Sequence, residues 1–540
     1  MKRHFLSTSM ALLLCLSCAA QDKTAQKFSA TINKTTAYKH LSVLASDEYE
    51  GRETGKKGAW MAADYIKKYF KGLGLQGPVN GDYFQPIDMV TYDMSNMAFS
   101  LNGQAREYGK DFVISTSTVG MGGFKFNAAE VVFAGYGLDK EGYNDFKGID
   151  IAGKVVMIFA AGDPTLKGGI VPPPADRAAR RKAMLSAQNK IQYLIDHQAV
   201  AVIQIDPYLD HITEDMKAAY AGAGQPMLKT PESTARMQKM KSLPSIRITT
   251  ALANEILKGG NTTVEALQEK IVSAVKPASQ VLKADVAGAA VKEEQKVRAE
   301  NVLGFMEGSD PVLKAEILVV TGHYDHIGLT TSGTDKVNNG ADDDGSGTTG
   351  VLMLAEAFTK AKKAGKGPKR SILFMTVVGE EKGLLGSEWY SEHPVFPLEK
   401  TITDLNIDMI GRVDKAHESS PEYIYIIGSD MLSSDLNRIG IKANEDYIKM
   451  NLDMMYNNRT DPNQFYYRSD HYNFAKHGIP VIFYFSGVHE DYHQPGDEVS
   501  KINFDLLSKR AQLVYYTAWE LANGSNRPVV DKNDDGSPKK

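Results

Sequence analysis

Cysteine is almost absent from this chain. Its 540 residues include two cysteines, Cys15 and Cys18, and both lie within the first 20 residues. The rest of the sequence cannot form a disulfide bond or supply a thiolate. This excludes a cysteine nucleophile and a cysteine-ligated zinc site.

The chain also lacks an excess of charge of either sign. Its formal net charge is −4 and its isoelectric point is near 6.3. Such a balance does not provide the basic surface that nucleic-acid binding requires. With 42% hydrophobic residues over this length, the chain can form two or three domains with cores of their own.

Long hydrophobic runs are absent except near the N-terminus. An apolar run over residues 5–16 follows a basic segment at residues 2–4 and precedes small residues at 17–20. This order is typical of a secretory signal peptide, and the run is too short to span a membrane. We therefore expect residues 1–20 to be a signal peptide and the protein to be exported to the periplasm, the outer membrane or the medium.

Cys18 is a candidate for lipid attachment. Bacterial lipoprotein signals end in a small residue followed by cysteine, and Ser17 and Cys18 match that order. Cys15 stands where leucine is usual, so cleavage after Ala20 without a lipid is the alternative. A lipid on Cys18 is the only membrane attachment that the sequence suggests.

The pattern of apolar residues divides the remaining chain into four segments. Residues 24–126, with a helical pattern over residues 32–74, are predicted to begin the main domain. Short apolar runs bounded by glycines predict a β-rich inserted domain over residues 127–282. Residues 277–298 are interpreted as a crossing back to the main domain. Strands and helices alternate from residue 301 onward, and residues 283–525 are predicted to be the catalytic part of the main domain. Residues 526–540 are predicted to be a disordered tail.

Candidate functional residues follow the predicted strands of residues 283–525. The alternation predicts an α/β fold with a mostly parallel mixed sheet sandwiched by helices. Because ligands bind beyond the carboxyl ends of parallel strands, we expect residues at these ends to converge. Apolar runs at 317–320, 371–378, 403–407 and 479–485 lead to His323, to Glu380 and Glu381, to Asp408 and to His493.

These residue types are those of a two-metal hydrolytic site. Two divalent ions a few Å apart need a bridging carboxylate, further ligands for each ion and an open position for water. An acidic loop bounded by glycines, residues 340–347, offers Asp343 as the bridge, with Asp342 and Asp344 as alternatives. The predicted ligands are His323, Asp343, Glu381, Asp408 and His493.

Carboxylates beside these ligands suggest the proton chemistry. Glu380 and Glu381 are adjacent and face different directions, so one can bind a metal while the other takes a proton from water. Asp325, two residues after His323, is placed to orient that imidazole through its second ring nitrogen.

Two further polar groups lie near these motifs. His326 follows Asp325 and is as readily a bystander as a participant. Ser469, Asp470 and His471 have the composition of a serine-hydrolase triad, but adjacent residues do not converge as such a triad requires.

Together these motifs resemble the co-catalytic zinc aminopeptidase family, which includes bacterial leucyl aminopeptidases, glutamate carboxypeptidase and the transferrin receptor. Residues 44–55 are similar to an N-terminal motif of its exported bacterial members, and residues 135–155 to the protease-associated domain that such members carry as an insertion. The resemblance implies two zinc ions per chain, with Asp343 as the bridge, His323 and Asp408 on one ion, and Glu381 and His493 on the other.

The resemblance also implies catalytic roles. Glu380 would be the general base and Asp325 the carboxylate that supports it. Tyr492 matches a tyrosine that polarises the scissile carbonyl in carboxypeptidase-like members, although some aminopeptidases have an aliphatic residue there. The segment 469–471 matches a structural motif near the site.

The predicted function is an exported zinc aminopeptidase that hydrolyses N-terminal residues from peptides. The ligand types suit zinc best and would also accept cobalt or manganese. Carboxypeptidase or dipeptidase action is the first alternative. Glutaminyl cyclase is the second, and the full loop 340–347 argues against it. A non-enzymatic peptide-binding relative is the third, and it would be expected to lack ligands that this chain retains.

Overall fold

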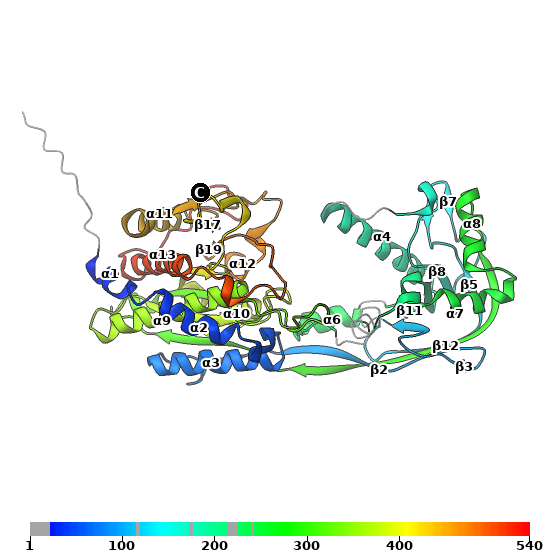
Figure 1. Ribbon diagram of the computed structural model, residues 1–540, viewed down its shortest axis with the longest axis horizontal. Coiled ribbons are helices and arrows are strands. Elements are labelled where there is room, and N and C mark those ends of the chain that lie inside the picture. Colours follow the sequence, from blue (N-terminus) through cyan, green and yellow to red (C-terminus); the bar gives the residue numbers. More distant parts are fainter. Residues whose placement is uncertain are drawn as a thin grey trace, which may run out of the picture.

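The computed structural model describes residues 22–114, 119–171, 177–213, 220, 224–239 and 242–539. The predicted signal peptide, with Cys18, lies outside these residues. Figure 1 shows two lobes joined by a long antiparallel ribbon of strands β2 (Met89–Leu101) and β12 (Gln280–Val297). We call residues 22–88 with 298–539 the main lobe, and residues 89–297 the inserted lobe. Among the described residues, no helix is long and apolar enough to cross a membrane.

The main lobe is built on an eight-stranded mixed sheet. Its four central strands, β15, β14, β16 and β19, run parallel, so their carboxyl ends share one edge. In spatial order the strands are β1 (Phe84–Pro86), β13 (Glu300–Met306), β15 (Ser371–Val377), β14 (Ile317–His323), β16 (Thr401–Ile407), β19 (Val481–Phe485), β17 (Tyr423–Ile427) and β18 (Asn451–Asp453).

Helices cover both faces of this sheet because its side chains alternate between two cores. Along β14, Leu318 and Val320 belong to one core, while Ile317 and Val319 belong to the other. This period of two is that of a strand buried on both faces. The predicted α/β class is therefore confirmed. The first core is covered by α1 (Lys23–Ser29), α2 (Lys34–Leu44), α3 (Lys57–Leu73), α9 (Gly347–Lys363), α11 (Ser434–Ala443) and α13 (Phe504–Asn523), and the second by α10 (Leu385–Glu392) and α12 (His471–Ala475).

The inserted lobe has its own nine-stranded sheet. Its helices are α4 (Arg177–Asp196), α6 (Pro231–Lys239), α7 (Thr250–Leu257) and α8 (Val264–Ala274). Besides β2 and β12, its strands are β3 (Gln104–Ala105), β4 (Phe112–Ile114), β5 (Phe124–Phe133), β8 (Val155–Phe159), β9 (Ala201–Ile205), β10 (Met227–Leu228) and β11 (Ser245–Ile248), and a separate hairpin pairs β6 (Asp139–Lys140) with β7 (Tyr143–Asn144).

The inserted lobe extends further along the chain than residues 127–282, the range predicted from the sequence. Its sheet begins at β2 and ends with β12, at Val297. In β12 the buried positions are small or alternate with charged residues, as in Leu282, Lys283 and Ala284. The segment therefore has little of the apolar content by which a strand is recognised. Its pairing with β2 and β5 makes it a strand.

The C-terminal residues also differ from the prediction of a disordered tail. The amide of Lys532 donates to Leu432 O at 3.2 Å, and Asp531 Oδ1 accepts from the amide of Ser434 at 2.9 Å. Lys532 also pairs with Pro538 in an isolated bridge. These contacts hold the described end of the chain against the main lobe.

Candidate metal centre

The main-lobe sheet brings the five predicted ligands to one edge. β14 ends at His323, and Asp408 directly follows β16. Glu381 and His493 lie in the segments that follow β15 and β19, and Asp343 lies in an irregular turn before α9. Because the four strands are parallel, positions far apart in sequence become neighbours.

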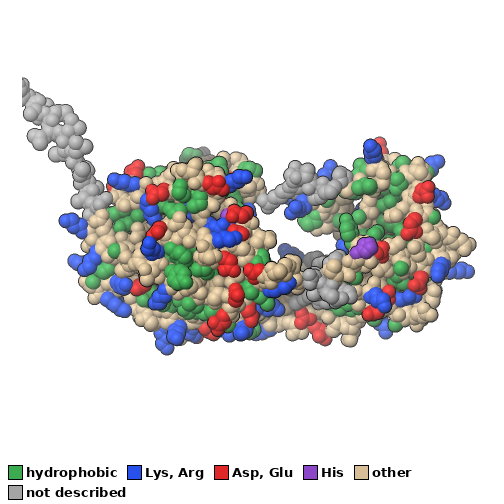
Figure 2. All heavy atoms as spheres, viewed as in Figure 1, with side chains coloured by type: hydrophobic (Ala, Val, Ile, Leu, Met, Phe, Trp, Pro, Cys, Tyr) green, Lys and Arg blue, Asp and Glu red, His purple; other side chains and the backbone are tan. Residues whose placement is uncertain are grey.

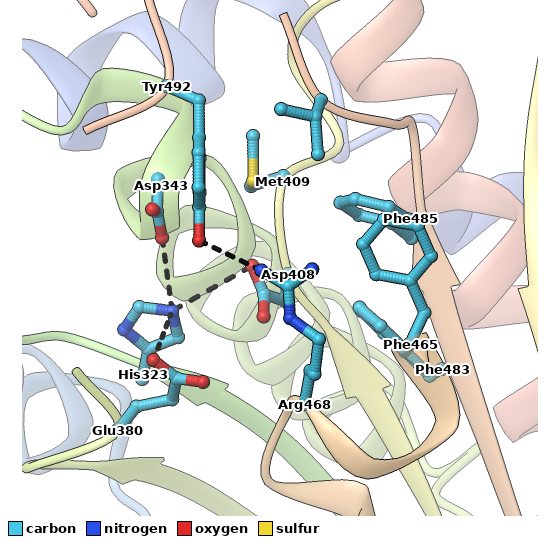
Figure 3. A pocket seen from close by; sticks show the side chains of 11 residues that line it. His323, Asp343, Glu380, Asp408, Met409, Phe465, Arg468, Phe483, Phe485 and Tyr492 are labelled. Atoms are coloured by element: carbon cyan, nitrogen blue, oxygen red, sulfur yellow. Dashed lines mark hydrogen bonds and ion pairs between the residues drawn. The ribbon is translucent and has the colours of Figure 1, made fainter. Parts of the chain in front are cut away.

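One group of donor atoms surrounds His323. Its Nε2 atom lies 3.3 Å from Asp343 Oδ1, 3.7 Å from Asp408 Oδ1 and 3.8 Å from Glu380 Oε2. Figure 3 shows these side chains pointing toward one another. His323 is 1% exposed, so the group is shielded from water on the imidazole side.

A second group shares Asp343 with the first. His493 Nε2 lies 3.1 Å from Asp343 Oδ2 and 3.1 Å from Glu381 Oε2. The two oxygens of Asp343 therefore face different donor groups, which is the arrangement that a carboxylate bridge between two cations requires.

The donor atoms of these residues are of the types that bind divalent cations. Four carboxylates with little exposure lie together, and such like charges are unfavourable unless cations or protons compensate them. Burial acts to lower the pKa of His323, but Glu380, Asp343 and Asp408 raise it well above its usual value. Imidazole together with carboxylates is a zinc-type ligand set.

The sequence left Asp342, Asp343 and Asp344 as alternatives for the bridging carboxylate. In the structure, the two neighbours of Asp343 have structural roles instead. Asp344 accepts from the amides of His323, at 3.0 Å, and Gly347, at 2.8 Å. Asp342 accepts from the amide of Gly411 at 2.6 Å. Both carboxylates hold backbone segments together, whereas Asp343 alone of the three faces both donor groups.

Asp325 differs in detail from the prediction. His323 Nδ1 donates to the main-chain carbonyl of Asp325 at 3.0 Å, while the nearest carboxylate oxygen is 3.8 Å away. The carboxylate instead accepts from Thr54 Oγ1 at 2.5 Å and from the amide of Glu380 at 3.3 Å. Asp325 therefore orients the imidazole through its backbone and positions the Glu380 segment through its side chain.

Arg52 is a residue near the site that sequence reasoning did not single out. It is 1% exposed, and its guanidinium donates to the carbonyls of Tyr324, Asn339 and Gly340. These carbonyls flank His323 and the acidic loop, so Arg52 ties the two segments together. The only sequence signal was its place within the motif at residues 44–55.

Ser469 supports a ligand and is not part of a triad. Its Oγ donates to Asp408 Oδ2 at 2.7 Å and accepts from Asn406 Nδ2 at 2.8 Å. His471 is fully buried, and neither of its ring nitrogens has a hydrogen-bond partner among the described residues.

His326 lies closer to the site than its neighbours in sequence suggested. It is fully buried, and its Nδ1 atom lies 2.9 Å from Glu381 Oε1. Together with Asp343 and Glu381 it forms a group able to hold a metal ion. Its position three residues after His323, in the same loop, was the available signal.

A pocket with one apolar wall opens beside the first donor group. Figure 3 shows aromatic side chains along one wall and Tyr492 and Arg468 across from His323. Arg468 Nη2 donates to Tyr492 Oη at 3.4 Å, and the Tyr492 ring stacks on His493 at 3.9 Å between centroids. The apolar wall consists of Met409, Phe465, Phe483, Phe485 and Val488.

Comparison with known sequences gives a family match that lies within the main lobe and several similar proteins. Residues 301–518 match the family model described as peptidase family M28. The chain is 29% identical over 275 residues to leucine aminopeptidase 1 of Sclerotinia sclerotiorum, which covers 49% of this chain and 65% of that protein. It is 25% identical over 242 residues to aminopeptidase YwaD of Bacillus subtilis, a match that covers 43% of this chain and 47% of that protein. The chain spans about half the length of the curated relatives it matches.

Comparison with solved structures extends over both lobes. An aminopeptidase from Aneurinibacillus sp. strain AM-1 matches with a TM-score of 0.51 and 18% identity, covering 96% of this chain and 100% of that chain. A zinc aminopeptidase from Bacillus subtilis matches with a TM-score of 0.50 and 18% identity, covering 94% of this chain and 98% of that chain. These likenesses show a shared fold.

Proposed function

Since residues 301–518 match the model of peptidase family M28, we propose that this protein is a zinc-dependent exopeptidase that removes residues from the N-terminus of peptides. The observation that carries the proposal is the pair of donor groups that share Asp343, with Glu380 beside them. Relatives named as aminopeptidases support the choice of the N-terminus.

The two donor groups are proposed to hold one zinc ion each. Bound zinc polarises a carbonyl oxygen and lowers the pKa of bound water from about 15.7 toward 7. The other steps belong to side chains of this chain. The proposed ligands are His323, Asp343 and Asp408 for one ion, and Asp343, Glu381 and His493 for the other.

Glu380 is proposed to accept the proton of the attacking water and to return it to the leaving amine. Its side chain is 12% exposed and lies 3.8 Å from His323 Nε2, so it borders the first donor group and remains open to the pocket. Its amide is held by Asp325 at 3.3 Å, which limits the motion of the carboxylate. General acid–base catalysis of this kind contributes about 10²–10⁴-fold to rate.

Tyr492 is proposed to donate a hydrogen bond to the scissile carbonyl oxygen. Burial, with the charges of Asp343 and Glu381, holds the pKa of Tyr492 above its usual range. The phenol therefore keeps its proton at neutral pH. A protonated donor at this edge of the pocket can stabilise negative charge that develops on the substrate oxygen.

The inserted lobe is proposed to be a protease-associated domain that limits the size of peptides reaching the site. α10 and α12, which flank the site, lie on the side of the main lobe toward the inserted lobe (Figure 1). Figure 2 shows a hollow between the upper parts of the two lobes. A peptide must enter past both lobes if it approaches from this side.

Export is proposed from the N-terminal pattern at residues 1–20. The mature protein is expected outside the cytoplasm of a bacterial cell, either free or attached through a lipid on Cys18. Mass spectrometry of the N-terminal peptide from fractionated cells tests this. A chain that retains Met1 and remains in the cytoplasm would contradict it.

Carboxypeptidase or dipeptidase action is the second candidate, and Arg468 favours it. Its guanidinium lies beside Tyr492 at the pocket, where it could pair with a carboxylate of the substrate. An aminopeptidase does not need a cation at this position.

Matched peptides distinguish the candidates. The purified protein is assayed on one peptide sequence with a free N-terminus, with an acetylated N-terminus and with an amidated C-terminus, each with and without a chelator. Loss of single residues from every substrate except the acetylated one, abolished by the chelator and restored by zinc, is expected. Cleavage of the acetylated peptide but not the amidated one would instead assign carboxypeptidase action.

A further inference from the structure

His326 is a buried histidine that is held rigidly beside the metal centre. Its side chain is fully buried, and its amide donates to Arg52 O at 3.1 Å. Its ring lies against Gly340, where an added Cβ would be 2.5 Å from His326 Cδ2. Gly340 also has φ of +55°, a conformation that disfavours a side chain. The backbone and the glycine together fix the direction of the ring.

The ring points at atoms that lack hydrogen-bond partners. His326 Nδ1 lies 2.9 Å from Glu381 Oε1 and 3.8 Å from Asp343 Oδ2. The first distance is that of a close ion-pair contact, and neither ring nitrogen of His326 forms a hydrogen bond of regular geometry among the described residues. The same is true of Glu381 Oε1 and His493 Nε2.

Unpaired buried polar atoms are rare in folded proteins, and each requires an explanation. Here three of them come from separate segments and surround the same two carboxylates: His326 groups with Asp343 and Glu381, and His493 Nε2 lies 3.1 Å from an oxygen of each. The rings of His326 and His493 approach these carboxylates from two directions, with centroids 5.7 Å apart and planes at 72°. Lone pairs that converge in this way repel one another unless a proton or a metal cation lies between them, and one cation compensates all of them at once.

We infer that His326 is a fourth protein donor at the metal position formed by Asp343, Glu381 and His493. The inference rests on the proposed metal-dependent function. It goes beyond that function because it assigns an additional ligand to one metal position and predicts that the two positions differ in zinc affinity. Zinc sites with four protein ligands are typically closed structural sites, whereas catalytic sites keep a position open. The position with His326 is therefore the tighter one and fills first, while the position of His323 keeps the open coordination for substrate.

A purely positioning role is the competing explanation. In that case His326 would only hold Glu381 in place by a hydrogen bond, and the metal position would contain one imidazole. Counting the imidazole ligands separates the two explanations.

Zinc affinity is measured first, by titrating the metal-free chain against a chromophoric chelator. Wild type is expected to bind two zinc ions per chain. His326→Asn is expected to bind one of them at least about 10- to 100-fold more weakly, since loss of a residue that merely supports a ligand has an effect of that size. The affinity for the other ion is expected to stay unchanged.

His40→Asn is the matched control, because it also removes a buried imidazole. His40 is fully buried, and its Nδ1 is paired with Tyr65 Oη at 2.8 Å, within the helices of the main lobe. This variant is expected to bind both zinc ions with the affinity of wild type. An equal loss in both variants would indicate general destabilisation and would overturn the inference.

The second measurement needs no variant. In the cobalt-substituted wild type, each ligating imidazole contributes one exchangeable, strongly shifted N–H proton signal in NMR spectra. Three signals are expected, from His323, His326 and His493, and two would overturn the inference. Two bound zinc ions with unchanged affinity in His326→Asn would overturn it as well. A wild-type chain that binds no zinc would instead refute the proposed function, and this inference with it.

Discussion

Replacing Arg52 with lysine tests how the N-terminal segment supports the metal centre. The guanidinium makes four hydrogen bonds to main-chain carbonyls: Nε to Tyr324 at 2.8 Å, Nη1 to Leu44 at 2.7 Å and to Asn339 at 2.6 Å, and Nη2 to Gly340 at 2.8 Å. Lysine keeps the charge but concentrates its donors on one nitrogen. Even if that nitrogen replaces Nη1, the bonds to Tyr324 and Gly340 are lost.

The expected destabilisation follows from these two lost bonds. A hydrogen bond to a charged group contributes about 1.5–3 kcal/mol, so Arg52→Lys should lower the free energy of unfolding of the main lobe by about 3–6 kcal/mol. Since the two bonds hold the segments that carry His323 and Asp343, zinc affinity should fall as well.

Tryptophan fluorescence during urea unfolding of the metal-free protein measures the stability. The chain contains three tryptophans, Trp60, Trp389 and Trp519, and all belong to the main lobe, so the signal reports that lobe alone. Zinc affinity is then measured with a competing chelator.

Arg370→Lys is the matched control. Arg370 is fully buried and donates to the carbonyls of Leu521 at 2.9 Å and Gly524 at 2.6 Å. It directly precedes β15, at the opposite end of that strand from the metal centre. Arg370→Lys should therefore lose stability and keep its zinc affinity. Unchanged stability in Arg52→Lys, or an equal fall of zinc affinity in both variants, would refute the reasoning.

Three further predictions concern single side chains. Burial lowers the pKa of His40 from 6.5 to about 4, so the unfolded chain binds the proton first as pH falls. Between pH 7 and pH 5 the main lobe of wild type should therefore lose about 2 kcal/mol more stability than the main lobe of His40→Phe. This value is about 1.36 kcal/mol per pKa unit, taken over the interval from pH 6.5 to pH 5. Equal losses in urea unfolding at the two pH values would contradict this. Glu380→Gln should lower kcat by about 10²–10⁴-fold and leave zinc content unchanged, whereas loss of zinc would make Glu380 a ligand. Tyr492→Phe should lower kcat by about 10²–10³-fold with little change in KM, and a change in KM alone would assign Tyr492 to substrate binding.

The fold class and the similarity of residues 301–518 to peptidase family M28 could be predicted from the sequence because both depend on local patterns. The central strands are continuous apolar runs; two of them end at or directly before a residue able to bind metal, His323 and Asp408, and the segments after the other two carry Glu381 and His493. The extent of the inserted lobe could not be predicted in the same way. β12 contains small and charged residues, and its pairing with β2, almost 200 residues earlier in the chain, makes it a strand.

The sequence by itself determined which residue types are present and that they follow parallel strands, since burial on both faces of a sheet requires uninterrupted apolar segments. Only the tertiary structure decided which side chains of each motif face the metal centre. Asp343 faces it, whereas Asp342 and Asp344 hold backbone amides. Arg52 and His326 join the site through contacts with residues distant in sequence, and no local periodicity encodes such contacts. The physical reason is that a motif specifies donors, whereas packing against other segments specifies their directions.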